Sequence, residues 1–250
     1  MKAILSTLFT MLTFSLCAQS PGDIDLSFNP GTGANSNIFT TVIQSDGKII
    51  IGGDFTTYNG TTINRIARLN TDGTLDNTFT VGIGTNRSVY TSAIQSDGRI
   101  IIGGSFDTIN GTAKNHIARL NADGTLDGTF TVGTGANGSI QATTIQSDGR
   151  IIIGGSFDTI NGTAKNHIAR LNADGTLDGT FTVGTGANSD IQATAIQSDG
   201  RIIIGGDFTS YNGTAINRIA RLNINGTLDS TFTVGTGANY IVMANAIQSD

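Results

Sequence analysis

The stretch QSDGRIIIGGSF at residues 146–157 decides the fold of this chain. Its Asp148-Gly149 pair is a tight-turn signal, because glycine supplies the positive φ that hairpins need. The run Ile151-Ile152-Ile153 is apolar on both faces, as expected for a central strand covered from both sides. Gly154-Gly155 then allows another backbone to approach closely. The stretch therefore predicts a β-hairpin whose second strand lies inside a stack of sheets.

The same pattern recurs with a fixed period. Residues 94–137 and 145–188 are identical, which indicates a recent duplication. The segment Ile-Gln-Ser-Asp begins every 51 residues, at Ile43, Ile94, Ile145, Ile196 and Ile247. A period of roughly 40–50 residues is typical of repeat architectures such as propellers.

Each unit holds a second turn signal of the same kind, for example Ala173-Asp174-Gly175. Together, the two turns predict four short strands in two hairpins, at residues 140–146, 150–157, 167–172 and 176–181. A loop is expected between the two hairpins at residues 161–163, and another between successive units at residues 184–186. Four antiparallel strands per unit indicate a β-propeller blade. The rival is a parallel β-solenoid, whose coils are usually shorter and whose turns do not pair adjacent strands.

The phase of the repeat predicts how the chain is organised. A lone strand is expected at about residues 24–30, because Asp25 and Phe28 match Asp76 and Phe79 one period later. Four repeat units follow at about 36–234, and a fifth unit starts at 240–250. The fold class is therefore all-β, a propeller of 51-residue four-stranded antiparallel blades in an incomplete ring. We expect such a sequence to be a fragment of a longer protein, in which the lone strand completes the last blade.

The first residues resemble an export signal. Lys2 is followed by a largely apolar run at residues 3–16, which is shorter than the ~20 residues of a membrane span. We expect a signal peptide at residues 1–18, cleavage after Ala18, a propeller domain at 19–250, and a secreted or cell-surface location. The alternatives are a buried N-terminal strand or helix and a lipoprotein modified at Cys17.

Composition excludes several classes of protein. The 34 Gly, the 2 Pro and 19 acidic residues that are all Asp do not fit a helix-rich protein or collagen. The net charge of −5 argues against nucleic acid as a partner, since nucleic-acid binders need a basic face.

The motifs at residues 146–157, 161–163 and 168–181 together resemble the delta-60 repeat, a bacterial β-propeller repeat of uncharacterised function. The likeness runs from about Asp23 to Asp250. It implies a secreted or cell-surface protein, and it brings no catalytic residue with it.

One arginine and one aspartate recur in every unit. We expect each Arg to pair with the Asp across its hairpin and to hold blade to blade; the alternative is an anion-binding ring. The pairs are Arg68 with Asp76, Arg119 with Asp127, Arg170 with Asp178, and Arg221 with Asp229.

Metal and catalytic sites are not predicted. The turn aspartates, such as Asp148 and Asp174, lack the ligand density of calcium loops and fit turn chemistry instead. His116 and His167 occupy equivalent positions, which point apart in a propeller. The glycine-rich stretch 184–188 is not followed by a helical pattern, as a dinucleotide fingerprint would be. We therefore predict no catalytic residue, no metal and no cofactor.

The residues that vary between units mark a candidate binding face. They lie where the first strand of each unit begins, and variation over a fixed scaffold is how repeat proteins adapt to ligands. The alternative is neutral drift on exposed loops. Three positions vary: Ser36, Arg87, Gly138, Ser189 and Tyr240; Asn37, Ser88, Ser139, Asp190 and Ile241; Phe39, Tyr90, Gln141, Gln192 and Met243. The candidate binding residues are Arg87, Tyr90, Asp190 and Tyr240.

These observations favour a non-enzymatic binding or scaffold module for a protein or glycan. One alternative is an extracellular hydrolase or lyase acting on polysaccharide, with its active site in the channel or in a further domain. Another is an adhesin-like spacer. The sequence does not specify the ligand, the blade number or the oligomeric state.

Overall fold

The computed structural model describes residues 23 and 25–248, and this part of the chain is all-β. The predicted signal peptide at residues 1–18 lies outside the described residues. Within them, no helix is long and apolar enough to cross a membrane.

Each repeat unit folds into a blade, which contains a three-stranded antiparallel sheet and a separate two-stranded hairpin. The Ile-Ile-Ile strand is the middle strand of the sheet, as predicted. Blade 1 comprises β1 (Ile38–Ile43), β2 (Ile49–Gly53), β3 (Thr57–Tyr58), β4 (Thr61–Thr62) and β5 (Ile66–Leu69). Blade 2 comprises β6 (Val89–Ile94), β7 (Ile100–Gly104), β8 (Thr108–Ile109), β9 (Thr112–Ala113) and β10 (Ile117–Leu120). Blade 3 comprises β11 (Ile140–Ile145), β12 (Ile151–Gly155), β13 (Thr159–Ile160), β14 (Thr163–Ala164) and β15 (Ile168–Leu171). Blade 4 comprises β16 (Ile191–Ile196), β17 (Ile202–Gly206), β18 (Ser210–Tyr211), β19 (Thr214–Ala215) and β20 (Ile219–Leu222).

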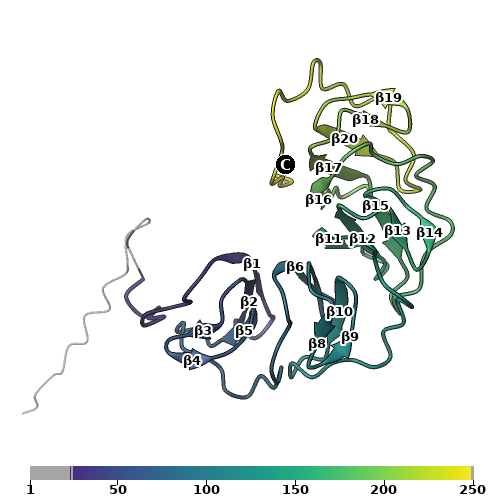
Figure 1. Cartoon of the computed structure of the whole chain (residues 1–250). Helices are drawn as coiled ribbons and strands as arrows, with labels where there is room; N and C mark the ends of the chain where they lie inside the picture. Colours follow the sequence, from purple (N-terminus) through teal and green to yellow (C-terminus); the bar gives the residue numbers. More distant parts are fainter. Residues whose placement is uncertain (1–22, 24, 249–250) are drawn as a thin grey trace, which may run out of the picture.

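The blades stand side by side in an open arc (Figure 1). The first strand of every sheet, β1, β6, β11 and β16, lies on the concave inner side. The small hairpins, such as β3–β4 and β13–β14, lie toward the outer side. This is the arrangement of propeller blades, and in the described residues the ring is not closed.

The fourth strand of each blade is reduced to a single bridge. Leu177 bridges Leu171, and the Asp178 N–H donates to the Arg170 carbonyl over 2.9 Å, but no longer ladder forms. The Asp178 carboxylate accepts bonds from the N–H and hydroxyl of Thr180, which turns the chain away from the sheet. The four-stranded expectation therefore overstates this strand, because a local side-chain turn competes with the ladder.

The same turn chemistry acts at the start of the described chain. Residues 25–28 form a turn rather than the expected lone strand, since the Asp25 carboxylate accepts bonds from the N–H and hydroxyl of Ser27. The Asn29 N–H then donates to the Asp72 carbonyl of blade 1 over 2.7 Å. At the other end, residues 241–248 have no assigned strand, although Val242 lies against Gly205.

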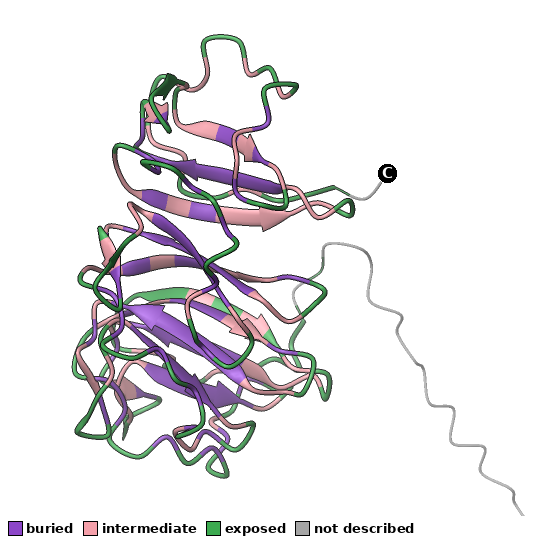
Figure 2. Cartoon of the chain, turned by 90° about the vertical axis from the view of Figure 1, so that its right-hand side faces the viewer, coloured by how far each residue is buried: buried purple, intermediate pink, exposed green. Residues whose placement is uncertain are grey.

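The core consists of layers between neighbouring blades (Figure 2). Ile151 and Ile153 pack into a cluster with Ile101 and Ile117 of blade 2, whereas Ile152 belongs to the cluster shared with blade 4. All three isoleucines of β12 are fully buried. Burying a side chain of this size stabilises by roughly 1.5–3 kcal/mol, so the stacking of blades is the main source of stability.

The two glycines that end β12 permit two different close approaches. A Cβ on Gly154 would lie 2.6 Å from the Ile191 Cγ2 atom of blade 4. A Cβ on Gly155 would collide with the carbonyl oxygen of Ser139 on the adjacent chain segment. The predicted role of this pair is confirmed, since side chains here would push apart both the blades and the strands.

The repeated arginine joins one blade to the next. The Arg170 Nε lies 2.7 Å from the Asp178 carboxylate in its own blade, and its Nη1 donates to the Ile224 carbonyl of blade 4 over 2.6 Å. The guanidinium also lies over the Phe181 ring at 4.8 Å from the centroid. Arg68 and Arg119 make the equivalent contacts. The predicted structural pair is confirmed, and these residues belong to the scaffold.

Candidate binding site on the inner strands

A β-bulge shapes the start of the inner strand in each blade. In blade 3, Ile140 pairs with Gly155 and Ala142 pairs with Gly154, so Gln141 has no partner in the ladder. The same slip occurs in the other three sheets. A bulge inserts one residue and redirects its side chain, and bulges are frequent beside functional sites.

The bulged residue is one of the three positions that vary between units. It is Phe39 in blade 1, Tyr90 in blade 2, Gln141 in blade 3 and Gln192 in blade 4. These four side chains and Met243, their equivalent in the next unit, line a hollow of about 320 Å³ on the inner side of the arc. The fold therefore brings together residues that are 51 positions apart in the sequence.

Two aromatic rings occupy one end of this hollow. The ring centroids of Phe39 and Tyr90 are 5.4 Å apart and the planes meet at 62°, an edge-to-face contact. Phe39 keeps 45% of its surface exposed. This partly exposed aromatic pair on the concave side of the sheet stack gives an apolar surface for a ligand.

A second hollow of about 480 Å³ adjoins the first and shares the two aromatic residues and the two glutamines. Its other walls consist of small hydroxyl, methyl and amide side chains of the inner strands and of the segment that follows blade 4: Thr40, Thr41, Thr91, Ala142, Thr143, Ala193, Thr194, Ala244 and Asn245. Three buried polar atoms here, Gln141 Oε1, Thr143 Oγ1 and Asn245 Oδ1, have no hydrogen-bond partner. We call the two adjoining hollows the inner-strand site.

The predicted binding residues do not all meet. Tyr90 lies in the inner-strand site, whereas the walls of the two hollows do not include the other three. Arg87 is 63% exposed and lies 3.5 Å from the Asp107 carboxylate. Asp190 lies 3.6 Å from His167 Nδ1, and Tyr240 is 77% exposed. These three residues surround the starts of the inner strands rather than line the hollows.

The sequence contains a signal for three site residues that are not among the predicted binding residues. Phe39, Gln141 and Gln192 vary at the same position as Tyr90, and a bulge at that position aims all of them inward. Thr143 was missed, because a threonine in a strand is ordinary and its unpaired hydroxyl is visible only in three dimensions.

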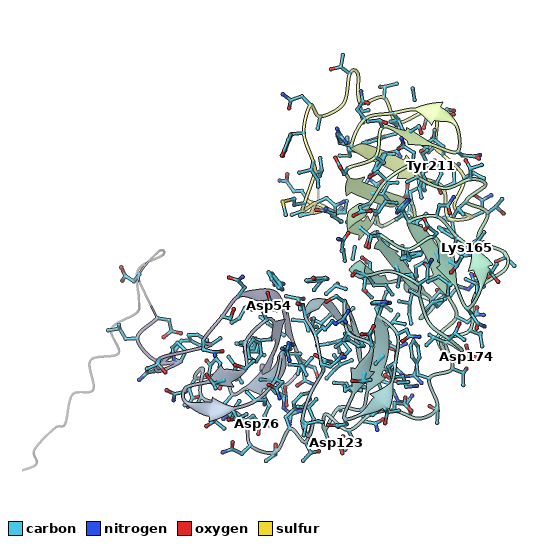
Figure 3. The ribbon with its side chains drawn as sticks, viewed as in Figure 1. Asp54, Asp76, Asp123, Lys165, Asp174 and Tyr211 are labelled. Carbon is cyan, nitrogen blue, oxygen red and sulfur yellow. The ribbon has the colours of Figure 1, made fainter. Side chains whose placement is uncertain are left out.

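The turn aspartates are used within their own turns. The Asp174 Oδ1 accepts bonds from the Thr176 N–H and hydroxyl at 2.9 and 2.7 Å, and these bonds lower the pKa of Asp174. Figure 3 places Asp123 and Asp174 on the outer side of the arc, away from the inner strands. This confirms turn chemistry as their role.

The two histidines are part of the links between strands. His167 Nδ1 lies 3.1 Å from the Gly155 carbonyl, and burial lowers the pKa of His116. Across the described residues, no group of three His, Cys, Asp or Glu side chains could hold a metal ion.

Four stacked antiparallel sheets around a shared inner surface define a β-propeller repeat protein. The chain belongs to the family described as "Domain of unknown function (DUF5122) beta-propeller", which matches residues 44–79, 95–130, 146–181 and 197–232. Every matched segment begins just after the inner strand of its blade. The family pattern therefore covers the scaffold and leaves out the bulged residues.

Several solved structures are similar to this chain, although none of those named here exceeds 19% identity. The WD40 β-propeller domain of Doa1 is 19% identical with a TM-score of 0.49, over 75% of this chain and 51% of that one. Two Bacteroides thetaiotaomicron proteins are each 14% identical: the extracellular domain of the putative hybrid two-component system BT3049, with a TM-score of 0.47, and that of the putative one-component system BT4673, with 0.45. The matches cover 77% and 75% of this chain and 21% of each of those chains. No curated protein matches the chain.

Proposed function

We propose that this protein is a secreted or cell-surface binding module, which holds a protein or glycan at the inner-strand site without catalysing a reaction. The observation that carries the proposal is the position of the variable residues. The residues at one of the three variable positions stand at a bulge in every blade and together line one hollow, while the residues between the blades repeat almost unchanged. If the repeats were selected only for the stacking of blades, the residues that line the hollow would have no reason to vary more than the residues between the blades.

The loop residues extend the proposed site. Arg87 and Asp190 precede inner strands, Tyr240 occupies the equivalent position after blade 4, and all three are accessible to solvent. We assign these three residues to contacts with the parts of a ligand that project beyond the hollows. Tyr90 is assigned to contacts inside the hollows. The charges of Arg87 and Asp190 would orient a bound ligand rather than add much affinity, since exposed ion pairs contribute roughly 0–1 kcal/mol.

The proposed location rests on the first residues and on the family. We propose a signal peptide at residues 1–18, cleaved after Ala18, followed by a propeller domain at 19–250 made of delta-60 repeats. N-terminal sequencing of the exported protein tests the cleavage site, and a lipid on Cys17 would contradict it.

The binding role is tested with variants that copy a residue from another blade. Phe39→Gln and Tyr90→Gln introduce the side chain that blades 3 and 4 carry at the same bulge, so the fold should tolerate them. We expect both variants to lose binding to glycans on an array or to proteins captured from the cell surface. Ile224→Ala is the matched control, because Ile224 is exposed in a turn where blades 2 and 3 carry alanine.

Unchanged binding by both glutamine variants would contradict the proposed site. Release of new reducing ends from a polysaccharide would instead indicate an enzyme.

A further inference from the structure

We infer that the occupant of the inner-strand site is a neutral saccharide. This inference rests on the proposed binding function and names its ligand. It follows from three properties of the site: an aromatic surface, unpaired uncharged polar atoms, and walls without charge.

The aromatic surface fits one face of a sugar ring. A pyranose presents C–H groups on its faces, and these carry partial positive charge. The π face of an aromatic ring carries partial negative charge, so such C–H groups pack well on it. Phe39 and Tyr90 offer two rings in contact, and Phe39 is 45% exposed. A fully apolar ligand would need no polar partners, yet the rest of the site is polar.

The polar atoms beside the rings match hydroxyl groups. The Gln141 Oε1 can only accept a hydrogen bond, whereas the Thr143 Oγ1 can donate and accept. Both atoms are buried and without a partner. A hydroxyl group also donates and accepts, so adjacent sugar hydroxyls can satisfy both atoms at once. Gln192, which follows Gln141 in the next blade, adds a second carboxamide to the same wall.

The charge of the site excludes an acidic sugar. The walls of both hollows, as far as the structure describes them, consist of uncharged side chains. Recognition of a carboxylate, sulfate or phosphate relies on Arg or Lys. Arg87 stands outside the hollows and already has the Asp107 carboxylate beside it. The total volume suits a short oligosaccharide, since sites for small ligands measure roughly 300–1,000 Å³.

The test is calorimetric titration of the whole chain with neutral oligosaccharides of glucose, mannose, xylose and N-acetylglucosamine. An acidic series of oligogalacturonates and sulfated oligosaccharides is titrated in parallel. We expect a neutral oligosaccharide to bind with an affinity that does not change between low and high salt. Tyr90→Gln and Thr143→Ala should each weaken that binding at least about tenfold, equivalent to ~1.4 kcal/mol. Ile224→Ala again serves as the control.

The outcomes separate this inference from the proposed function. Salt-dependent binding of the acidic series alone, or a protein ligand lost in Tyr90→Gln, would overturn the saccharide assignment and leave the binding function in place. Saccharide binding that is unaffected by both Tyr90→Gln and Thr143→Ala would overturn both.

Discussion

At the scale of single residues, glycines decide how closely the strands can approach. Gly155 faces the carbonyl oxygen of Ser139, and an added methyl group would have to displace backbone rather than a flexible side chain. Overpacking usually costs about 1–3 kcal/mol, and backbone displacement belongs at the upper end of that range.

We therefore predict that Gly155→Ala lowers the free energy of unfolding by about 3 kcal/mol. Gly179→Ala is the matched control, because Gly179 has open space around its Cβ position and no strained φ. It should change stability by less than about 0.5 kcal/mol. Urea unfolding followed by circular dichroism measures both. Equal stability of the two variants would contradict the close approach at Gly155.

The carboxylate of Asp178 makes stability depend on pH. Burial alone would raise its pKa, but hydrogen bonds from Thr180 and Arg170 outweigh burial and hold the pKa at about 2, against an ordinary value of 3.8. The pKa of Asp127 is lowered to about 2 in the same way, by Thr129 and Arg119. A group whose pKa is lower in the folded state stabilises the fold above its unfolded pKa, and this contribution is lost as pH falls through the folded value.

We predict that the free energy of unfolding decreases steeply as pH falls from about 4 to about 2. Asp178→Asn removes one of the titrating groups, so its unfolding free energy should start lower at neutral pH and then decrease less over the same interval. Urea unfolding at a series of pH values measures the two slopes. Parallel curves for the variant and the parent chain would contradict the role of Asp178.

At the scale of structural elements, the arginine of the third sheet strand links neighbouring blades. In blades 1 to 3, its Nη1 reaches a carbonyl of the next blade, whereas the bonds recorded for Arg221 run to Asp229 and Thr231 of its own blade. Arg170 is 3% exposed and Arg221 is 17% exposed. Arg170 and Arg221 therefore occupy the same position of the repeat, and only Arg170 makes the contact between blades.

We predict that Arg170→Ala lowers the free energy of unfolding by about 3 kcal/mol, because it leaves the buried Asp178 without its nearest charged partner and removes the contact with blade 4. Arg221→Ala should cost about half as much, since it breaks a more exposed pair within one blade. Thermal and urea unfolding compare the two variants. Equal losses would show that the arginine acts within its own blade alone.

Most elements could be predicted from the sequence, because the turns are encoded by local chemistry. Asp148-Gly149 and Asp174-Gly175 give the expected tight turns, with a φ of 83° at Gly149 and 93° at Gly175. The hairpin β13–β14 was expected as a loop, although Asn161-Gly162, with φ values of 50° and 72°, is itself a hairpin signal. Its strands have only two residues each and are too short for a periodic pattern.

The candidate site could be predicted only in part. Comparison of the units identified the variable positions, and therefore Tyr90. Which of the variable positions lines the hollows is decided by the bulge between Ile140 and Ala142. This bulge shifts the register by one residue and turns Gln141 inward. A bulge arises from the pairing of two strands and leaves no reliable mark on either one. Variation between the units therefore also points to Arg87, Asp190 and Tyr240, which lie outside the walls of the hollows.

At the scale of the whole molecule, stability is distributed over the junctions between blades. Each blade contacts its neighbours along the arc, so the contribution of a position depends on whether another blade covers it. The first residue of the inner strand shows this dependence directly. Ile140 is fully buried in the cluster between blades 2 and 3, whereas Ile38, at the same position of blade 1, is 42% exposed. Ile43, at the other end of β1, is 71% exposed.

We predict that the same substitution has very different effects at these two equivalent positions. Ile140→Ala should lower the free energy of unfolding by about 3 kcal/mol, because it removes buried methylene groups and leaves a cavity between two blades. Ile38→Ala should cost less than about 1 kcal/mol, because water already reaches its side chain. Hydrogen exchange adds the location of the effect: Ile140→Ala should reduce protection of the middle strands β7 and β12 on both sides of the junction, while Ile38→Ala should leave them unchanged. Since the two isoleucines share their strand position and bulge, a similar loss at both would mean that stability resides within the blades rather than between them.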